Sequence, residues 1–64
     1  MDYKISLKAA RVNANMTQAE AAKRLKISDS TIRSWERGDT SPRAGMIGMI
    51  CEVYGIPPEL LFIA

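Results

Sequence analysis

The sequence predicts an all-α domain of five short helices packed around one core. Apolar residues recur at helical spacing along much of the chain, and the alternation typical of strands is not seen. Polar caps and a glycine delimit two neighbouring helices that only three residues separate. The 64 residues, 47% of which are apolar, are enough for a single core. We therefore expect residues 1–64 to form one small domain.

The first of the two capped helices is predicted to begin near Gln18. Thr17 and Glu20 have the spacing of a capping box, in which the threonine hydroxyl accepts from a backbone N–H and the glutamate reaches back to the cap. Three apolar residues of this helix share an inward face, namely Ala21, Ala22 and Leu25. The two adjacent alanines would allow another helix to approach closely.

The second capped helix is predicted over residues 29–37. Ser28 is its N-terminal cap, and Gly38 is suited to end it because glycine readily adopts the left-handed conformation of a helix end. The link between the two helices, residues 26–28, is so short that the helices must cross steeply. Residues 17–37 therefore have the form of a helix-turn-helix motif.

Three further helices complete the predicted fold. An amphipathic helix is expected within residues 5–15, on the N-terminal side of the motif, with the Asn-Ala-Asn run at residues 13–15 as its stop. After a loop, a fourth helix is expected over residues 44–54, with Gly55 at its end. Proline is well tolerated in the first turn of a helix, so the two prolines at positions 57–58 are expected to open a last short helix through residue 61 or 62.

The basic residues are concentrated in one part of the chain. All nine lysines and arginines lie between Lys4 and Arg43. With the five acids of residues 1–43 they leave that part of the chain a net charge of +4, whereas residues 44–64 carry a net charge of −2. This asymmetry favours a surface that faces a polyanion, because neutralisation of phosphates by Lys and Arg is the sequence-independent part of nucleic-acid affinity. Ordinary solubilising charge is the alternative.

The composition argues against several other classes of protein. One cysteine and no histidine leave no internal disulfide and no ligand set for a structural zinc, and Cys51 is expected to be an inert packing residue. The chain has no glycine-rich phosphate loop and no nucleophile with an evident base, so we expect neither an enzyme nor a cofactor. No segment has the pattern of a signal peptide or a membrane span, and no small-molecule ligand is indicated. A cytoplasmic protein is expected.

The helix predicted over residues 29–37 has two different faces. Ile32 and Trp35 would point into the domain, which leaves polar and basic side chains on the outer surfaces. Our candidates for contact with the base edges of DNA are Asp29, Ser30, Arg33 and Ser34. An arginine can make two bonds to guanine, whereas a carboxylate accepts only from an amino group such as that of cytosine. Stabilisation of the helix start is the alternative for Asp29, and plain solubilising charge is the alternative for Arg33 and Arg37.

A series of residues in fixed order runs through nearly the whole chain, from residue 5 to residue 62. Its members are Arg11, Met16–Gln18, Ala22, Ile27–Ser28, Ile32, Trp35–Gly38, Pro42, Ile47, Gly55–Ile56 and Leu60–Leu61. This series resembles the phage repressor and Cro-like helix-turn-helix domains, the xenobiotic-response-element-like regulators of bacteria. Two positions depart from the pattern. Ala21 stands where leucine is usual and Trp35 where a smaller aliphatic residue is usual, so we expect the indole to fill volume that the alanine leaves.

The resemblance implies a lambda-repressor-like fold of five helices, whose dimers bind operator half-sites about one helical turn apart. By position, Gln18, Arg37 and Arg43 would contact backbone phosphates of DNA. Arg11 and Glu36 would form a partly buried structural ion pair that ties the first helix to the end of the third. For Gln18, a solvated position at the helix start is the alternative.

The helix predicted over residues 44–54 carries more apolar side chains than the core requires. Its inward residues would be Ile47, Ile50, Cys51 and Tyr54. On another face, Met46, Met49 and Val53 would be exposed in a monomer, and with Phe62 of the tail they are our candidates for a homodimer interface. The alternative is a fourth helix that is buried on all sides in a tight small core.

Together these features predict a sequence-specific regulator of transcription that binds a double-stranded DNA operator. The first hypothesis is a dimeric repressor or Cro-like protein of phage or mobile-element type. The second is a protein-interaction module, such as an antitoxin that binds a partner through the methionine-rich face of the fourth helix. Binding that weakens steeply with salt would favour the first hypothesis.

Overall fold

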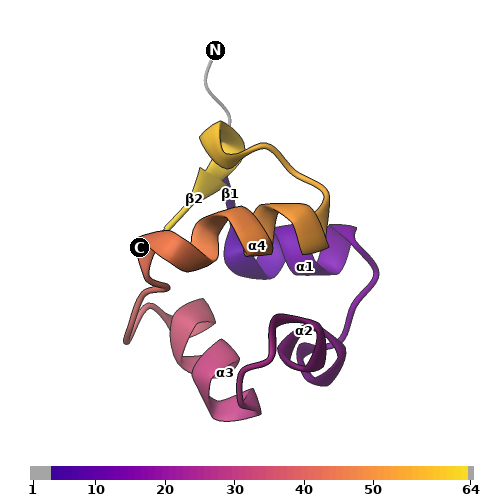
Figure 1. Cartoon of the computed structure of the whole chain (residues 1–64), viewed down its shortest axis with the longest axis vertical. Helices are drawn as coiled ribbons and strands as arrows, with labels where there is room; N and C mark the ends of the chain where they lie inside the picture. Colours follow the sequence, from indigo (N-terminus) through magenta and orange to yellow (C-terminus); the bar gives the residue numbers. More distant parts are fainter. Residues whose placement is uncertain (1–3, 64) are drawn as a thin grey trace.

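Four α-helices make up most of the computed structural model, which describes residues 4–63 (Figure 1). The elements in chain order are β1 (Ile5–Ser6), α1 (Leu7–Asn13), α2 (Gln18–Leu25), α3 (Asp29–Arg37), α4 (Ala44–Tyr54), the 3-10 turn η1 (Pro58–Leu60) and β2 (Leu61–Phe62). Helices α2 and α3 lie at one end of the molecule and the β1–β2 pair lies at the other, with α1 and α4 between them (Figure 1). The helical fold predicted from the sequence is therefore correct in outline.

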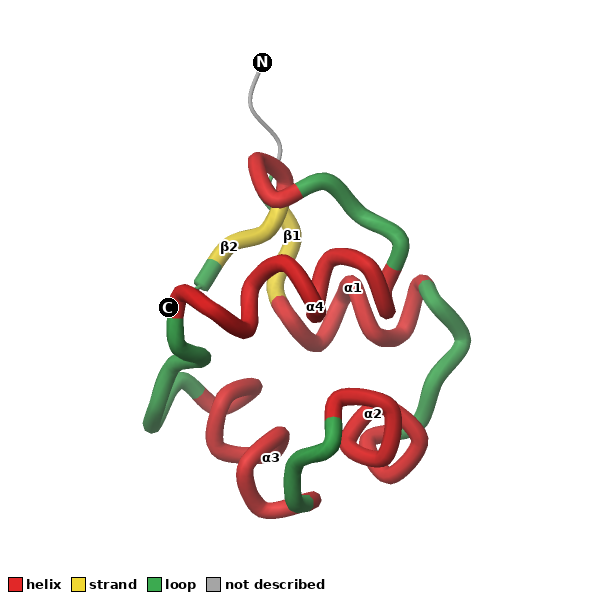
Figure 2. The backbone as a smooth tube through the Cα atoms, viewed as in Figure 1, coloured by secondary structure: helices red, strands yellow, loops and turns green. Residues whose placement is uncertain are grey.

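The helix-turn-helix segment has the predicted boundaries. Helix α2 begins at Gln18 and ends at Leu25, and α3 runs from Asp29 to Arg37. The short link between them is visible in Figure 2. Lys26 allows the turn by adopting a left-handed conformation with a φ of 59°, and Gly38 ends α3 with a φ of 83°. The local signals in residues 17–38 were sufficient to place both helices.

The predicted fifth helix is wrong. Only residues 58–60 form a 3-10 turn, after which Leu61 turns to extended backbone with a φ of −91° and a ψ of 123°. The extended residues pair in parallel with the chain start, with Ile5 opposite Leu61 and Ser6 opposite Phe62. The helical turn stops at Leu60 because the next two residues take part in strand pairing, which satisfies backbone groups that a longer helix would have bonded internally.

The first helix begins later than predicted, and it ends within the Asn-Ala-Asn run that was predicted to stop it. It begins at Leu7 because Ser6 acts as its cap, with the Ser6 Oγ accepting from the backbone N–H of Ala9 at 3.1 Å. It ends at Asn13, and Asn15 then takes a left-handed conformation with a φ of 60°. Residue 5, which we expected in this helix, belongs to β1 instead.

The core draws residues from all four helices and from β2. Its buried members are Leu7, Ala10, Ala21, Ala22, Leu25, Ile32, Ile50, Cys51, Tyr54 and Leu61. The inward face predicted for α2 is confirmed. Trp35 is only half-buried, contrary to the prediction that it lies in the core, and it lines a cavity of about 210 Å³ together with Phe62. The indole packs against the edge of the core rather than inside it.

The exposed apolar stripe predicted on α4 is also wrong. Met46, Met49 and Val53 are half-buried and pack against the core, as does Ile47, which we expected to be fully inward. The reason is that α4 is contacted by α1, α2 and η1, so side chains on several of its faces find neighbours. Within residues 4–63, the exposed large apolar side chains are those of Val12, Leu60 and Phe62. No helix of this part of the chain is long and apolar enough to cross a membrane.

Candidate nucleic-acid interface

Side-chain caps hold the first turns of α2 and α3 in place. In α2, the Thr17 Oγ1 accepts from the Glu20 N–H at 3.1 Å, and the Glu20 Oε1 accepts from the Thr17 N–H at 2.9 Å. These two bonds are the predicted capping box, and they lower the pKa of the Glu20 carboxyl. In α3, the Ser28 Oγ accepts from the Thr31 N–H at 3.1 Å. Both helices of the motif therefore start from fixed positions.

A buried polar network joins α1, α2 and α3. The Arg11 Nε donates to Glu36 Oε2 at 2.7 Å, and the Arg11 Nη2 donates to Glu36 Oε1 at 3.1 Å. The Gln18 Nε2 donates to the same Oε1 at 3.1 Å, while the Arg11 Nη1 donates to the backbone carbonyl of Met16 at 2.8 Å. The ion pair that the family resemblance implies is thus present, and it also takes in Gln18.

Burial makes this network important for the stability of the fold. The side chains of Arg11 and Glu36 are only 9% and 4% exposed, and the hydrogen bond to Glu36 raises the pKa of Arg11. Tyr54 of α4 lies close enough to this network to feel its charge. The pKa of the Tyr54 phenol is raised to about 12, mainly by burial and to a smaller extent by the negative charge of Glu36. Breaking a buried pair on one side leaves an uncompensated charge, so this network fixes the relative positions of the three helices.

Three of the predicted base-contact residues lie along the outer side of α3. Asp29 and Ser30 are exposed in its first turn, and the Ser30 Oγ lies 3.1 Å from the Ser28 Oγ. Ser34 is half-buried one turn further on, with its Oγ 2.8 Å from the Thr40 Oγ1. Hydroxyl groups can donate and accept at once, so these contacts leave both serines able to bind a further group.

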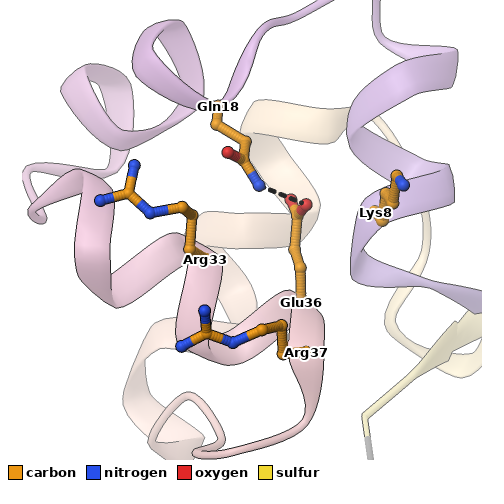
Figure 3. Close-up of a pocket in the computed structure, with 5 residues that line it drawn as sticks. All are labelled: Lys8, Gln18, Arg33, Glu36 and Arg37. Carbon is orange, nitrogen blue, oxygen red and sulfur yellow. Dashed lines mark hydrogen bonds between the residues drawn. The ribbon is translucent and has the colours of Figure 1, made fainter.

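A crevice of about 200 Å³ lies between α1, α2 and α3 (Figure 3). Its lining residues are Lys8, Gln18, Arg33, Glu36 and Arg37. Gln18 and Glu36 point toward each other, and the guanidinium groups of Arg33 and Arg37 extend in the same direction from α3 (Figure 3). The structure thus brings Gln18 and Arg37, two predicted phosphate contacts, together with Arg33, a predicted base contact.

The remaining phosphate candidates have different surroundings. Arg37 Nε donates to Asp39 Oδ2 at 3.0 Å, in a surface pair whose side chains are both more than half exposed. Such a pair contributes little stability and is easily exchanged for another anion. Arg43 is exposed at the cap of α4 and does not line the crevice.

Sequence reasoning missed Lys8 and Asp39. Lys8 lies three residues before Arg11 on α1, and residues three apart share a helix face. Because Arg11 was expected to reach Glu36, its three-residue spacing from Lys8 would have placed Lys8 near the same crevice. Asp39 follows the end of α3 in a loop, and its pairing with Arg37 has no signal in the sequence beyond proximity.

The described residues offer neither a metal site nor a readily ionised thiol. Among residues 4–63, no group of three His, Cys, Asp or Glu side chains could hold a metal ion. Cys51 is buried and reduced, and burial raises the pKa of its thiol, which makes the reactive thiolate scarce at neutral pH. The concentration of cationic and hydrogen-bonding side chains on α1, α2 and α3 suits a polyanion instead.

Comparison with known proteins agrees with this geometry. Neither the curated proteins nor the solved structures gave a match to the chain. A family model described as helix-turn-helix matches residues 7–61, from the first turn of α1 to the start of β2. The match includes all four helices and every residue of the crevice. The chain therefore belongs to the Cro/CI-type helix-turn-helix family of DNA-binding transcription regulators.

Proposed function

We propose that this protein is a repressor that binds a DNA operator as a homodimer, without catalysing a reaction. Its bound form would act by occupancy, excluding polymerase or another regulator from the site. The family resemblance, rather than any contact in the structure, points to a repressor of phage or mobile-element type.

The observation that carries this proposal is the way in which α3 is presented. Asp29, Ser30, Arg33 and Arg37 are exposed along it, so one side of the helix remains available. The helix is capped at both ends and braced through Glu36, which limits its movement relative to α1 and α2. A major groove about 12 Å wide admits one such helix.

The contacts divide into two kinds. In the proposed complex, Ser30 and Ser34 bond to base edges, and Asp29 either accepts from a cytosine amino group or stabilises the helix start. Gln18, Arg37 and Arg43 contact the phosphate backbone and set the register of α3 in the groove. Arg33, which also lines the crevice, is proposed to make two bonds to a guanine.

The homodimer is proposed to form through α4 and the chain end, with Met46, Met49, Val53 and Phe62 at the interface. Phe62 is 52% exposed and Leu60 is 39% exposed, and η1, which contains Leu60, contacts α4. The half-buried methionines could contribute only their outer surfaces. No observation favours the second function, a partner-binding module that uses the methionine face of α4, over the homodimer.

Selection of bound sequences from random double-stranded oligonucleotides tests the proposed function. We expect a palindrome whose half-site centres lie about one helical turn apart. Ser30→Ala and Ser34→Ala should each relax the base preference at one position per half-site. Failure to enrich any motif, in a preparation shown by circular dichroism to be folded, would contradict sequence-specific binding.

Sedimentation tests the dimer separately. Phe62→Asp should shift the protein toward monomer, both free and on the selected operator. Val12→Asp is the matched control, because Val12 is 53% exposed on α1, outside the proposed interface. A wild-type protein that remains monomeric at high micromolar concentration and on the operator would contradict the proposed interface.

A further inference from the structure

We propose that Thr40, in the loop after α3, is a positioning residue for Ser34 and thereby sets the base preference at one position of the operator half-site. This inference rests on the proposed function, which it deepens by giving a role in specificity to a residue outside α3. The Ser34 Oγ and the Thr40 Oγ1 lie 2.8 Å apart. Because a serine hydroxyl can bond to several bases, whatever fixes its position affects which base it prefers.

A loop joins α3 to α4 (Figure 2), and its first residues are bonded to the last turn of α3. Gly38 ends the helix in a left-handed conformation with a φ of 83°. Its N–H donates to the Trp35 carbonyl at 3.2 Å. The Asp39 N–H donates to the Ser34 carbonyl at 3.0 Å, and the two bonds together form a Schellman motif. The backbone therefore holds Thr40 beside the residue that its side chain contacts.

Thr40 is the more rigid member of this pair of hydroxyls. A threonine carries two heavy atoms on its Cβ, which restricts rotation about χ1, whereas a serine carries only one. The loop backbone and the restricted χ1 together fix the Thr40 Oγ1. The 2.8 Å contact then limits the directions in which the Ser34 Oγ can point.

The contact should sharpen the choice of base. Two hydroxyls carry two hydrogens and four lone pairs, and the bond between them uses one hydrogen and one lone pair. Ser34 can thus still accept from a base, or donate to one when Thr40 is the donor of the shared bond. In either case its oxygen keeps one position. Without the Thr40 hydroxyl, Ser34 would sample other rotamers, and ordering it on binding would cost affinity for the preferred base.

The other serine among the base-contact candidates has a different support. The Ser30 Oγ lies 3.1 Å from the Oγ of Ser28, which is the cap of α3 and also accepts from the Thr31 N–H. The support of Ser30 is therefore local to the start of the helix. A change at Thr40 should affect the base position of Ser34 and leave that of Ser30 unchanged.

Base discrimination at one operator position provides the test. Ser34→Ala first identifies this position, as the one at which the selected motif becomes relaxed. Affinity is then measured for four duplexes that differ only in that base pair. Thr40→Val removes the hydroxyl and keeps the shape of the side chain, so it should reduce discrimination by about 3- to 10-fold, the effect of losing one hydrogen bond. Thr40→Ser keeps the hydroxyl without the restricted χ1 and should lie between the wild type and Thr40→Val.

Two controls separate positioning from a general effect of the loop. In the Ser34→Ala background, Thr40→Val should cause no further change in discrimination at this position, because the group that it positions is absent. Asp39→Asn is the matched control, since it weakens the neighbouring surface pair with Arg37 and leaves both hydroxyls in place. It should change the affinity for all four duplexes by the same factor. Thr40 is exposed, so Thr40→Val should fold, and circular dichroism checks this.

The other outcomes overturn the inference in distinguishable ways. If Thr40→Val leaves discrimination unchanged while Ser34→Ala relaxes it, Ser34 acts without Thr40 and the proposed function stands. If Thr40→Val relaxes a different position, Thr40 reads a base itself, and if it weakens all four duplexes by one factor, it only supports the loop or the DNA backbone contact. If Ser34→Ala relaxes no position, Ser34 does not contact a base. If the wild-type protein enriches no motif, the proposed function fails and the inference falls with it.

Discussion

The two halves of this small domain are held together by different kinds of interaction. In the half formed by α1, α2 and α3, side-chain caps fix the helix starts and the network of Arg11, Glu36 and Gln18 ties the helices together. In the half formed by α4 and β2, α4 has no side-chain cap bond at its N-terminus and no acid in its first turn. Burial of apolar side chains such as Ile50 holds that half instead.

The polar half therefore determines where α3 and its side chains lie, whereas the apolar half mainly contributes stability. Hydrogen bonds are directional, so the polar half can hold α3 and the crevice in a defined geometry. Apolar burial depends on area and little on direction, so the other half can supply stability without constraining the binding surface. Perturbations of the two halves should therefore have different consequences, and three predictions test this.

Arg11→Met should have the largest effect. It leaves the Glu36 carboxylate buried with Gln18 as its remaining side-chain donor in the network, and loss of one partner from a buried pair costs about 3–5 kcal/mol. Urea denaturation measures this loss as a fall in the free energy of unfolding. The double variant Arg11→Met/Glu36→Leu has no unpaired charge and should recover most of the stability. A single-variant loss below about 1 kcal/mol would show that the pair is not the main brace of the polar half.

An intermediate effect should appear at high pH, through Tyr54 at the boundary of the two halves. Its phenol has a pKa of about 12 in the folded protein, above the ordinary value of 10. Below pH 10 the phenol is neutral in both states. Between pH 10 and 12 the unfolded chain releases the proton while the folded chain keeps it, so the free energy of unfolding should fall by up to about 3 kcal/mol.

Denaturation in urea at several pH values between 8 and 12 provides the measurement for Tyr54. Tyr54→Phe is the control, because lysines titrate in the same range and only the difference between the two proteins reports on the phenol. An equal pH dependence in both proteins would show that burial of Tyr54 does not couple its titration to folding.

The smallest effect should be a gain, in the apolar half. A Cβ added at Gly48, in the middle of α4, would meet no atom within 4 Å, and the residue is exposed. Gly48→Ala should raise the free energy of unfolding by about 0.5–1 kcal/mol, because alanine loses less backbone entropy on forming a helix. Gly55→Ala is the contrasting variant. Gly55 has a φ of 68°, so alanine there should cost about 1 kcal/mol. Thermal unfolding that moves both variants in one direction would contradict this reasoning.

Local chemistry explains what could be predicted from the sequence. Thr17, Ser28 and Gly38 act within one turn of their positions, so they located α2 and α3 without knowledge of the rest of the fold. Neither the pairing of residue 5 with residue 61 nor the burial of Met49 could be found in this way. Both depend on which segments become neighbours after folding.

The candidate site could likewise be predicted only in part from the sequence. Family resemblance placed Arg11, Glu36 and Gln18, and the structure brings these three residues together. The crevice, however, needs side chains from three helices at once, so the contribution of Lys8 could not be read from its own segment. Residue types identified the candidates, and the tertiary arrangement determined which of them line the same crevice.

The parallel pairing of β1 with β2 has a consequence for the order of folding. Contacts within the helix-turn-helix segment form between residues that are close in the chain, whereas the register of Ile5 with Leu61 closes a loop of 56 residues. The entropy of closing such a loop grows with the logarithm of its length and reaches about 3–4 kcal/mol here. This pair should therefore form late, open before the helices that carry the crevice, and show faster amide hydrogen exchange than those helices.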